Sequence, residues 1–257
     1  MVATPIGNLA DISLRALQVL RLDDAVACED TRHTQQLLRA YGLDRPGSQL
    51  LAVHQHNEAE AAQSVLDKLA QGQRVAYVSD AGTPAISDPG ARLVAAVRAA
   101  GYRVLPLPGA SSVVTVLSAS GMTGDNGFVF AGFLPSKAAE RQSAVQALAT
   151  ETRAVVLLEA PHRIEALAQA LAVLGERRVT LGRELTKQFE QIETLKAQDL
   201  AAWLTEKPER QRGEFALVVH DAPVAASKGE GERVLQLLLP ELPLKTCLLY
   251  TSDAADE

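Results

Sequence analysis

The sequence predicts an α/β fold in two lobes, with a mostly parallel sheet in the first lobe and a mixed sheet in the second. Short runs rich in β-branched residues alternate with amphipathic stretches of helical length, and this alternation changes near residue 108. The size agrees with this prediction, since 257 residues with 47% hydrophobic and 22% charged residues suffice to bury a sizeable core.

The expected elements follow one another along the chain. Turn residues bound each apolar run, and glycines at 42, 72, 101 and 175 end four of the amphipathic stretches. Strands are expected at residues 25–28, 50–53, 74–78, 102–105, 128–131, 154–158, 179–181, 192–195 and 215–219. Helices are expected at residues 13–22, 32–41, 58–70, 92–100, 138–149, 162–174 and 198–205.

The change near residue 108 sets the expected boundary between the lobes. Residues 180–195 contain two strands in succession without a helix, which indicates a mixed sheet in the second lobe. We therefore expect one α/β lobe over residues 1–107 and another over residues 108–221. Residues 222–246 are expected to be a linker and the start of a helical tail, in which Pro240 and Pro243 interrupt a helix.

Composition narrows the function classes. No apolar run is long enough to cross a bilayer, and no secretory signal is recognisable, so a cytosolic location is expected. Two cysteines cannot build a disulfide framework or a cysteine zinc site. The formal charge of −6 argues against indiscriminate nucleic-acid binding, although it leaves room for a local basic face.

Three loops are richer in Gly, Pro and small hydroxyl residues than a simple connection requires. They are residues 4–8, 79–90 and 108–112. Ligands of open α/β sheets bind beyond the carboxyl ends of the strands, where glycine lets the backbone approach a ligand closely. The loops therefore predict a ligand site, and the alternative is that they are ordinary strand-to-helix turns.

Three clusters of mixed charge directly follow expected strands. They are residues 28–32, 159–163 and 183–187. Arginine beside lysine on one rim suits a partner that bears phosphates, and the alternative is that each cluster forms structural salt bridges. The dinucleotide and P-loop glycine motifs are absent. His54 and His56 share a strand face without an obvious third ligand, so a polar contact is expected there rather than zinc.

These loops and clusters closely resemble the ribosomal RNA methyltransferases of the tetrapyrrole methylase superfamily. The likeness runs from Val2 to about Thr246 and is strongest in Glu-Asp-Thr-Arg, Glu-Ala-Pro-His-Arg and Arg-Glu-Leu-Thr-Lys. The matching motifs are residues 2–16, 29–32, 79–84, 87–90, 108–112, 159–163, 183–187 and 213–215.

The resemblance implies methylation that depends on S-adenosylmethionine, at the ribose 2′-hydroxyl of one cytidine of 16S rRNA (position 1402 in the reference numbering). It also implies a homodimer, action on 16S rRNA or the 30S subunit, and a cofactor bound between the lobes. The cofactor residues implied by the motifs are Pro5, Ile6, Asp80, Pro84, Ile86, Ser111, Ser112, Leu158, Gly213 and Ala216.

The charged clusters supply the candidates for catalysis and RNA binding. A 2′-hydroxyl is a poor nucleophile, so a base or a cation beside the developing alkoxide should help. We expect Glu29 and Lys187 in these roles, although Asp30, Glu159 and Glu184 are also possible proton acceptors. The cations expected to hold RNA phosphates are Arg32, Arg163, Arg183 and Lys187. No metal is required.

Two other functions stay open. One is methylation of a small tetrapyrrole-type molecule, because the superfamily also contains such enzymes. The other is a non-catalytic RNA-binding assembly factor on the same fold. The intact Asp80, Ser111 and Ser112 disfavour this second alternative.

The two ends depart from the family pattern. Met1 stands where family members have a few apolar residues that complete a first strand. Residues 247–257 resemble the translation of a transposase adapter used in sequencing libraries. We expect this segment, with Cys247 and Tyr250, to be a non-native tail without functional weight.

Overall fold

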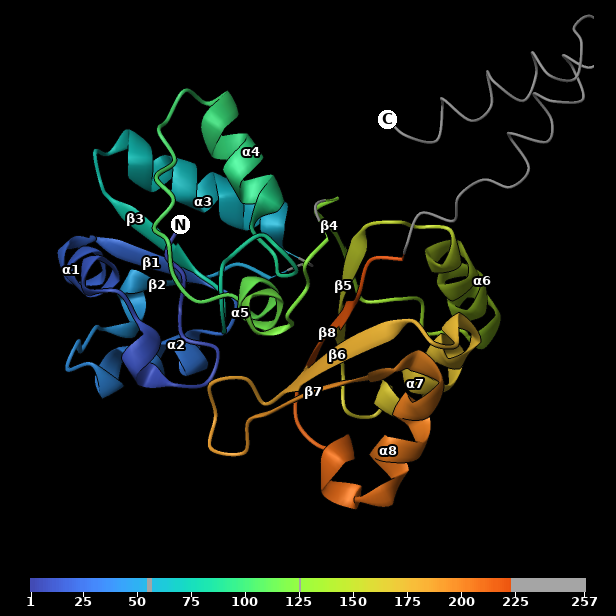
Figure 1. Cartoon of the computed structure of the whole chain (residues 1–257). Helices are drawn as coiled ribbons and strands as arrows, with labels where there is room; N and C mark the ends of the chain where they lie inside the picture. Colours follow the sequence, from blue (N-terminus) through green and yellow to red (C-terminus); the bar gives the residue numbers. More distant parts are fainter. Residues whose placement is uncertain (55–56, 125, 223–257) are drawn as a thin grey trace, which may run out of the picture.

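The computed structural model describes residues 1–54, 57–124 and 126–222, which form two sheets with helices on their faces (Figure 1). The expected linker beyond Ala222, the interrupted helix and the tail at 247–257 lie outside these residues, as does His56. None of the helices in the described ranges is long and apolar enough to cross a membrane.

The first sheet has three parallel strands in the order β2-β1-β3. Its strands are β1 (Ala25–Cys28), β2 (Leu50–Ala52) and β3 (Val75–Val78). Its helices are α1 (Leu14–Leu22), α2 (Thr31–Ala40), α3 (Glu58–Ala70) and α4 (Ala91–Ala99). Successive residues of a strand face opposite sides, so Val26 packs with α1 and α2 while Ala27 packs with α3 and α4. Each face therefore has its own apolar core.

The second sheet has five strands in the order β4-β5-β8-β6-β7. Its strands are β4 (Phe128–Gly132), β5 (Ala154–Glu159), β6 (Arg178–Arg183), β7 (Gln191–Lys196) and β8 (Phe215–Val219). Its helices are α5 (Ser112–Ala119), α6 (Ala138–Ala149), α7 (Ile164–Leu171) and α8 (Leu200–Glu206). Only β4 and β5 pair in parallel; β8 is antiparallel to β5 and β6, and β7 to β6, so the sheet is mixed as predicted.

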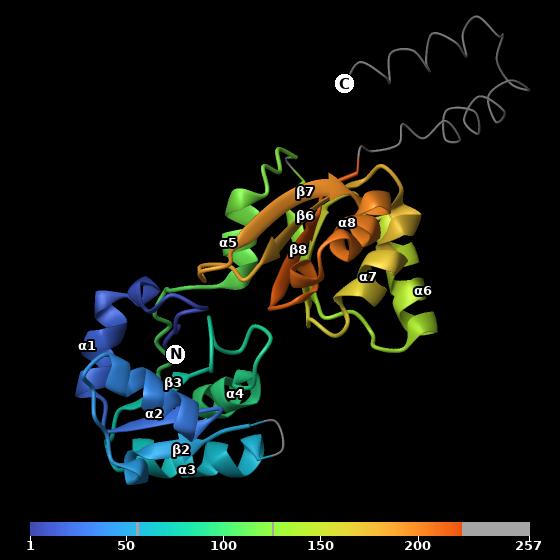
Figure 2. The ribbon, with the colours of Figure 1, turned by 90° about the horizontal axis from the view of Figure 1, so that it is seen from below.

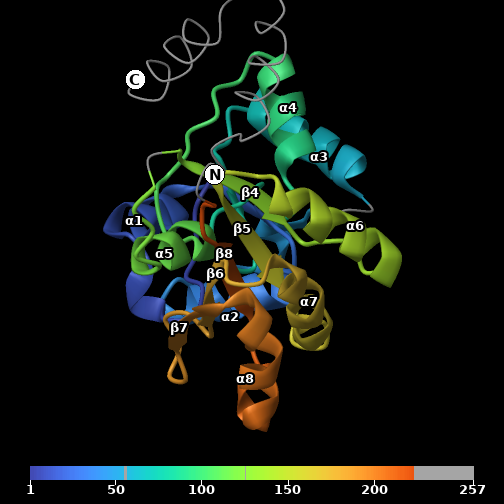
Figure 3. The same ribbon diagram turned by 45° about the vertical axis from the view of Figure 1, so that its right-hand side comes forward.

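The two faces of the second sheet are covered unequally. Helices α6, α7 and α8 lie together on one side, where they pack into the largest core cluster (Figure 3). On the other side lies α5 (Figure 2). Its Val113 and Val116 pack into a core cluster with residues of β5, β8 and Leu185. Ile6, from the loop near the N-terminus, packs against this same cluster. The face that bears α5 thus meets the loops of the first sheet.

A buried carboxylate fixes the end of the loop at residues 79–90. Glu58 of α3 accepts hydrogen bonds at Oε1 from the N–H groups of Gly90, Arg92 and Leu93, at 3.0, 3.0 and 3.3 Å. These donors belong to the first turn of α4, where N–H groups lack partners within the helix. One side chain of α3 therefore holds the start of α4 and, with it, the loop expected to bind a ligand.

Eight of the nine expected strands are present, but the strand expected at residues 102–105 is wrong. The Tyr102 N–H donates back to the Val97 carbonyl of α4 at 3.1 Å, and the contact with the N-terminal segment begins at Leu105, whose carbonyl accepts from the Met1 ammonium at 3.0 Å. Leu107 pairs with Val2 in an isolated bridge, and Val2 also pairs with Val78 of β3. A regular strand needs a paired strand along its whole length, and residues 102–104 pair with no strand among the described residues.

Helix α5 was not expected, because its sequence Ser-Val-Val-Thr-Val-Leu-Ser-Ala is rich in β-branched residues. Such residues lower helix propensity, and tertiary packing overrides that preference here. The helix expected at 162–174 ends at Leu171 and continues as a 3₁₀ turn, Ala172–Leu174. The helix expected at 198–205 likewise begins with a 3₁₀ turn, Ala197–Asp199, ahead of α8.

Candidate functional site

One edge of the second sheet collects several of the sequence-predicted site residues. Because β8 is antiparallel to β5 and β6, its first residues lie beside the last residues of those strands. Phe215 pairs with both Glu159 and Arg183, and Ala216 pairs with Leu158. The strands thus place the motifs at 159–163, 183–187 and 213–215 together, although they are far apart in sequence.

A cavity of about 390 Å³, here called cavity A, lies at this edge. Its walls come from β5, β8, the start of α5 and the loops of the first lobe. Ile6, Phe133, Leu158, Phe215 and Ala216 supply its apolar surface. Its polar lining residues are Ser87, Asp88, Ser112, Glu159 and Glu214.

A second cavity of about 470 Å³, here called cavity B, adjoins cavity A, since Ile6 and Glu214 line both. It lies between α2 and the loops at residues 5–7, 80–81 and 187. Pro5, Gly7, His33, Gln36, Asp80 and Lys187 are among its lining residues. Cavity B thus has Lys187 beside the carboxylates of Asp80 and Glu214, whereas cavity A has three carboxylates and no lysine or arginine in its lining.

The residues implied for the cofactor divide between these cavities. Ile6, Ser112, Leu158 and Ala216 line cavity A, while Pro5, Ile6 and Asp80 line cavity B. The linings of A and B do not include Pro84, Ile86, Ser111 or Gly213. Asp80 also has a local role, because its Oδ1 accepts the Asp30 N–H at 3.2 Å and links two loops.

Lys187 is held by two carboxylates. Its Nζ lies 2.9 Å from Glu184 Oε1 and 3.0 Å from Glu214 Oε2. Burial favours the neutral amine, but the hydrogen bonds to Glu184 and Glu214 outweigh it and raise the pKa of Lys187. Lys187 therefore remains a cation and cannot serve as a base.

The turn that carries Lys187 has an unusual backbone. Glu184 and Thr186 have φ angles of 51° and 66°, in the left-handed region that non-glycine residues rarely adopt. Gly7 and Gly213 accommodate this turn, since a Cβ on Gly7 would overlap the Lys187 stem and one on Gly213 would overlap Glu184. Lys187 thus packs directly on the N-terminal loop.

Glu29 follows β1 directly and is partly buried. Burial, followed by the nearby carboxylates of Asp80, Asp88 and Asp30, raises the pKa of Glu29. This shift increases the affinity of its carboxylate for a proton, as a general base requires. Glu29 is not among the residues that line cavities A and B.

The four cations expected to hold RNA differ in their surroundings. The Arg32 side chain is 88% exposed and pairs with Asp30 at 3.2 Å. Arg183 is buried and donates to the carbonyl oxygens of Arg212 and Phe189, at 3.2 and 3.0 Å. Arg163 pairs with buried Glu159 and donates to the Leu134 carbonyl. Each of the three clusters therefore contains an ion pair, as the salt-bridge alternative expects: Arg32 with Asp30, Arg163 with Glu159, and Lys187 with Glu184. Arg183 is held by backbone carbonyls instead.

Some lining residues lie outside the loops and motifs singled out from the sequence: Phe133 in cavity A, and His33, Gln36, Leu37 and Ala40 in cavity B. Phe133 follows Gly132, where β4 shifts register against β5 between Phe130 and Gly132. Such a bulge redirects the chain that follows it. Gly132, which directly follows the strand expected at residues 128–131, is the sequence feature that could have indicated this bulge.

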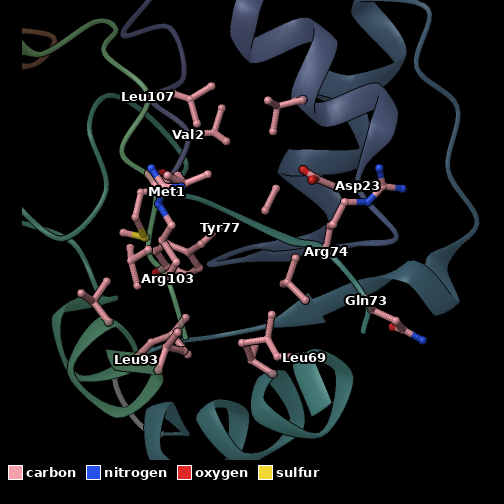
Figure 4. Close-up of a pocket in the computed structure, with 18 of the residues that line it drawn as sticks. Met1, Val2, Asp23, Leu69, Gln73, Arg74, Tyr77, Leu93, Arg103 and Leu107 are labelled. Atoms are coloured by element: carbon pink, nitrogen blue, oxygen red, sulfur yellow. The ribbon is translucent and has the colours of Figure 1, made fainter. Parts of the chain in front are cut away.

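A third cavity, here called cavity C, lies in the first lobe and has a volume of about 400 Å³ (Figure 4). It lies between β3 and residues 103–107, and its lining includes Met1, Val2, Leu69 and Leu93. Asp23 and Arg74 lie at its polar side (Figure 4). None of the residues expected to act in catalysis or binding lines this cavity. Cavities A and B are therefore the candidate site, because several residues expected to bind the cofactor or act in catalysis line them, whereas none lines cavity C, which has a similar volume.

Within the described ranges, no group of three or more His, Cys, Asp or Glu side chains is arranged so that it could hold a metal ion. His54 is described, and its N–H donates to Asn57 Oδ1 at 2.8 Å.

Comparison with known proteins agrees with this geometry. Residues 1–201 match the family model of tetrapyrrole (corrin/porphyrin) methylases. Curated proteins named ribosomal RNA small subunit methyltransferase I are 47% identical in Escherichia coli O157:H7 and 48% identical in Vibrio cholerae serotype O1. These matches cover 95% of this chain and 86% and 85% of those proteins.

Solved structures show the same fold at low identity. A cobalt precorrin-4 methyltransferase of cobalamin biosynthesis has a TM-score of 0.61 and 18% identity, over 84% of this chain and 92% of its own. A uroporphyrin-III C-methyltransferase from Thermus thermophilus, complexed with S-adenyl homocysteine, has a TM-score of 0.55 and 17% identity, over 84% and 94%. The chain therefore belongs to the tetrapyrrole methylase family, within the group of relatives named ribosomal RNA small subunit methyltransferase I.

Proposed function

We propose that this chain transfers a methyl group from S-adenosylmethionine to the ribose 2′-hydroxyl of a cytidine in 16S rRNA, at position 1402 in the reference numbering. The observation that supports this most strongly is the identity of 47–48%, over 95% of the chain, to relatives named for small-subunit rRNA methylation. The adjoining cavities A and B add support, since such a reaction needs a cofactor and an acceptor nucleotide side by side.

The residues of cavity A fit S-adenosylmethionine. Ile6, Phe133 and Leu158 offer apolar surface to an adenine ring and a methionine chain, and the carboxylates of this cavity suit a cationic ligand. Ser112 places a hydroxyl group at the start of α5. When bound, the cofactor supplies a methyl group on a positively charged sulfur.

Cavity B is the proposed place of the acceptor nucleotide. Lys187 is a permanent cation on its wall and is suited to a phosphate or a developing alkoxide. Glu29 is the proposed proton acceptor, because its raised pKa strengthens it as a base. It precedes Asp30, whose N–H donates to Asp80 of cavity B. Arg32 is the proposed exposed contact to RNA phosphates.

The test is methylation with labelled cofactor on three acceptors: 30S subunits that lack the modification, free 16S rRNA, and a porphyrinoid. We expect label on rRNA, mapped to one cytidine and resistant to alkaline cleavage because the 2′-oxygen is blocked. The Lys187→Met variant should bind the cofactor and label rRNA at least tenfold more slowly. Label on the porphyrinoid alone would reverse the choice of substrate. Cofactor binding without transfer to any acceptor would favour an assembly factor.

The implied homodimer is part of this proposal. Light scattering of the purified chain should give twice the mass of one chain. A monomer at micromolar concentration would contradict the proposed homodimer.

A further inference from the structure

Asp80 lies two residues beyond the end of β3 and lines cavity B, and its side chain is only partly buried. Its Oδ1 accepts the Asp30 N–H at 3.2 Å, which fixes the orientation of the carboxylate. Its Oδ2 makes no hydrogen bond with a described residue, yet it is not one of the fully buried oxygens that lack a partner. Oδ2 is therefore an accessible acceptor at the wall of the cavity.

The negative charge of Asp80 has no cation beside it in the part of the chain that the structure describes. Two other charged side chains that line cavity B, Lys187 and Glu214, lie 3.0 Å apart and pair with each other. Negative charge accumulates around Asp80, since burial and then the charge of Asp80 raise the pKa of nearby Glu29. Such a carboxylate repels RNA phosphates, so its place in an RNA site is favourable only where it meets a hydrogen-bond donor of the RNA.

The two cavities indicate which part of the nucleotide reaches Asp80. Cavities A and B share Ile6 and Glu214, so a ribose hydroxyl that receives a methyl group from cavity A should lie at this boundary. Asp80 lines cavity B alone, as do Leu37 and Ala40 of α2, which offer apolar surface to the flat face of a base. The base of the acceptor nucleotide is thus the part that cavity B places beside Asp80.

The polar edge of the base decides whether a carboxylate is a suitable partner. Cytosine presents an amino group at N4, where uracil presents the carbonyl oxygen O4. A carboxylate only accepts hydrogen bonds, so it pairs with the N4 amino group and repels O4. We propose that Asp80 Oδ2 accepts a hydrogen bond from the N4 amino group of the target cytosine and thereby selects cytidine against uridine. This inference rests on the proposed function and adds the residue that determines the base.

The test compares methylation of two 30S subunits that lack the modification, one with cytidine and one with uridine at the target position. The wild-type chain should methylate the cytidine subunit with a kcat/KM about 10–100-fold higher. In Asp80→Asn the amide oxygen still accepts the Asp30 N–H, and an amide donor replaces Oδ2. The ratio should fall to near one, because this donor pairs with O4 of uracil and leaves the cytosine amine without an acceptor.

Equal rates for the two subunits in the wild type, or an unchanged ratio in Asp80→Asn, would overturn this inference and leave the proposed function intact. Labelling of neither subunit by the wild type would overturn both. The ratio for the wild type needs no variant, so the inference stays falsifiable if Asp80→Asn does not fold.

Asp88→Asn is the matched control, because it removes the same charge from the same loop but at cavity A. It should leave the ratio of cytidine to uridine methylation unchanged, whatever its effect on the overall rate. An equal fall of the ratio in both variants would show that negative charge in general, and not a contact of Asp80, sets the preference, and would overturn the inference.

Calorimetry with S-adenosylhomocysteine, without RNA, tests the cofactor role that the family resemblance implies for Asp80. Asp80→Asn should bind this compound as tightly as the wild-type chain does. A loss of tenfold or more in affinity would assign the carboxylate to the cofactor and overturn its role in base selection.

Discussion

Asp23 should make the folded chain more sensitive to pH than its surface position suggests. It follows α1 and lines cavity C, with its Oδ2 buried and without a hydrogen-bond partner among the described residues. Burial raises its pKa from 3.8 to about 6, against the opposing attraction of Arg45 and Arg74. The folded state therefore holds the proton more tightly than the unfolded chain. Stability from this group is greatest below pH 3.8 and is lost as the pH rises through about 6.

The magnitude follows from the size of the shift. About two pKa units correspond to about 3 kcal/mol for a fully buried group, at 1.36 kcal/mol per unit. Asp23 is only partly buried, and solvent screening reduces the effect to about 1 kcal/mol. The Asp23→Asn substitution removes the charge and keeps the shape. It should raise the melting temperature at pH 7.5 by about 2–4 °C, the change expected for a domain of this size.

The assay is thermal unfolding of both proteins between pH 4 and 8, with the difference in melting temperature as the readout. That difference should be near zero at pH 4, where Asp23 is protonated, and should grow through pH 6. Asp24→Asn is the matched control, because hydrogen bonds from Arg74 lower the pKa of Asp24 and its loss should destabilise the fold at pH 7.5. A difference for Asp23→Asn that is flat with pH, or negative at pH 7.5, would refute the reasoning.

Three further predictions concern the candidate site. In Arg32→Ala, the slope of log RNA affinity against log salt concentration should become shallower by about one unit or somewhat less. Arg163→Ala should instead lower the melting temperature, because it breaks the ion pair with Glu159. An unaltered slope for Arg32→Ala would show that Arg32 does not contact RNA. Gly7→Ala should cost about 1–3 kcal/mol in unfolding measurements, because its Cβ overlaps the half-buried lysine stem of the neighbouring turn. The control, Gly47→Ala, enters open space and should be nearly neutral, so equal costs would contradict the overlap. Asp80→Ala should slow rRNA methylation about tenfold, since it releases the Asp30 N–H beside cavity B, and an unchanged rate would exclude that role.

The helices and strands that the sequence predicts correctly are those whose local residue pattern is enough to determine them. Residues 25–28 and 215–219 form strands with the expected bounds, because each is a continuous apolar run buried at every position. The parallel first sheet follows from the helices between its strands. The strand expected at 102–105 is wrong because pairing depends on a distant neighbour that local sequence does not reveal.

The candidate site is predictable in its loops but not in its polar partners. The loops at 4–8, 79–90 and 108–112 contribute Ile6, Asp88 and Ser112 to cavity A, as their composition indicated. The buried position of Arg183 could not be foreseen, because its partners are backbone carbonyl groups, which every residue offers. The same holds for Glu159, since only the folded sheet shows which of its two oxygens lacks a donor.

The place of β8 bears on how the chain assembles as it is synthesised. This strand is the last one in the described part of the chain, yet it lies between β5 and β6, which cannot complete their pairing until residues 215–219 emerge. Pairing across such sequence separations is slow, and open strand edges invite association with other chains in the meantime. The first sheet needs nothing beyond residue 78, so it can form while the second is still incomplete. A ribosome stalled before residue 215 would therefore hold a folded first lobe beside an unfinished sheet with two unsatisfied edges.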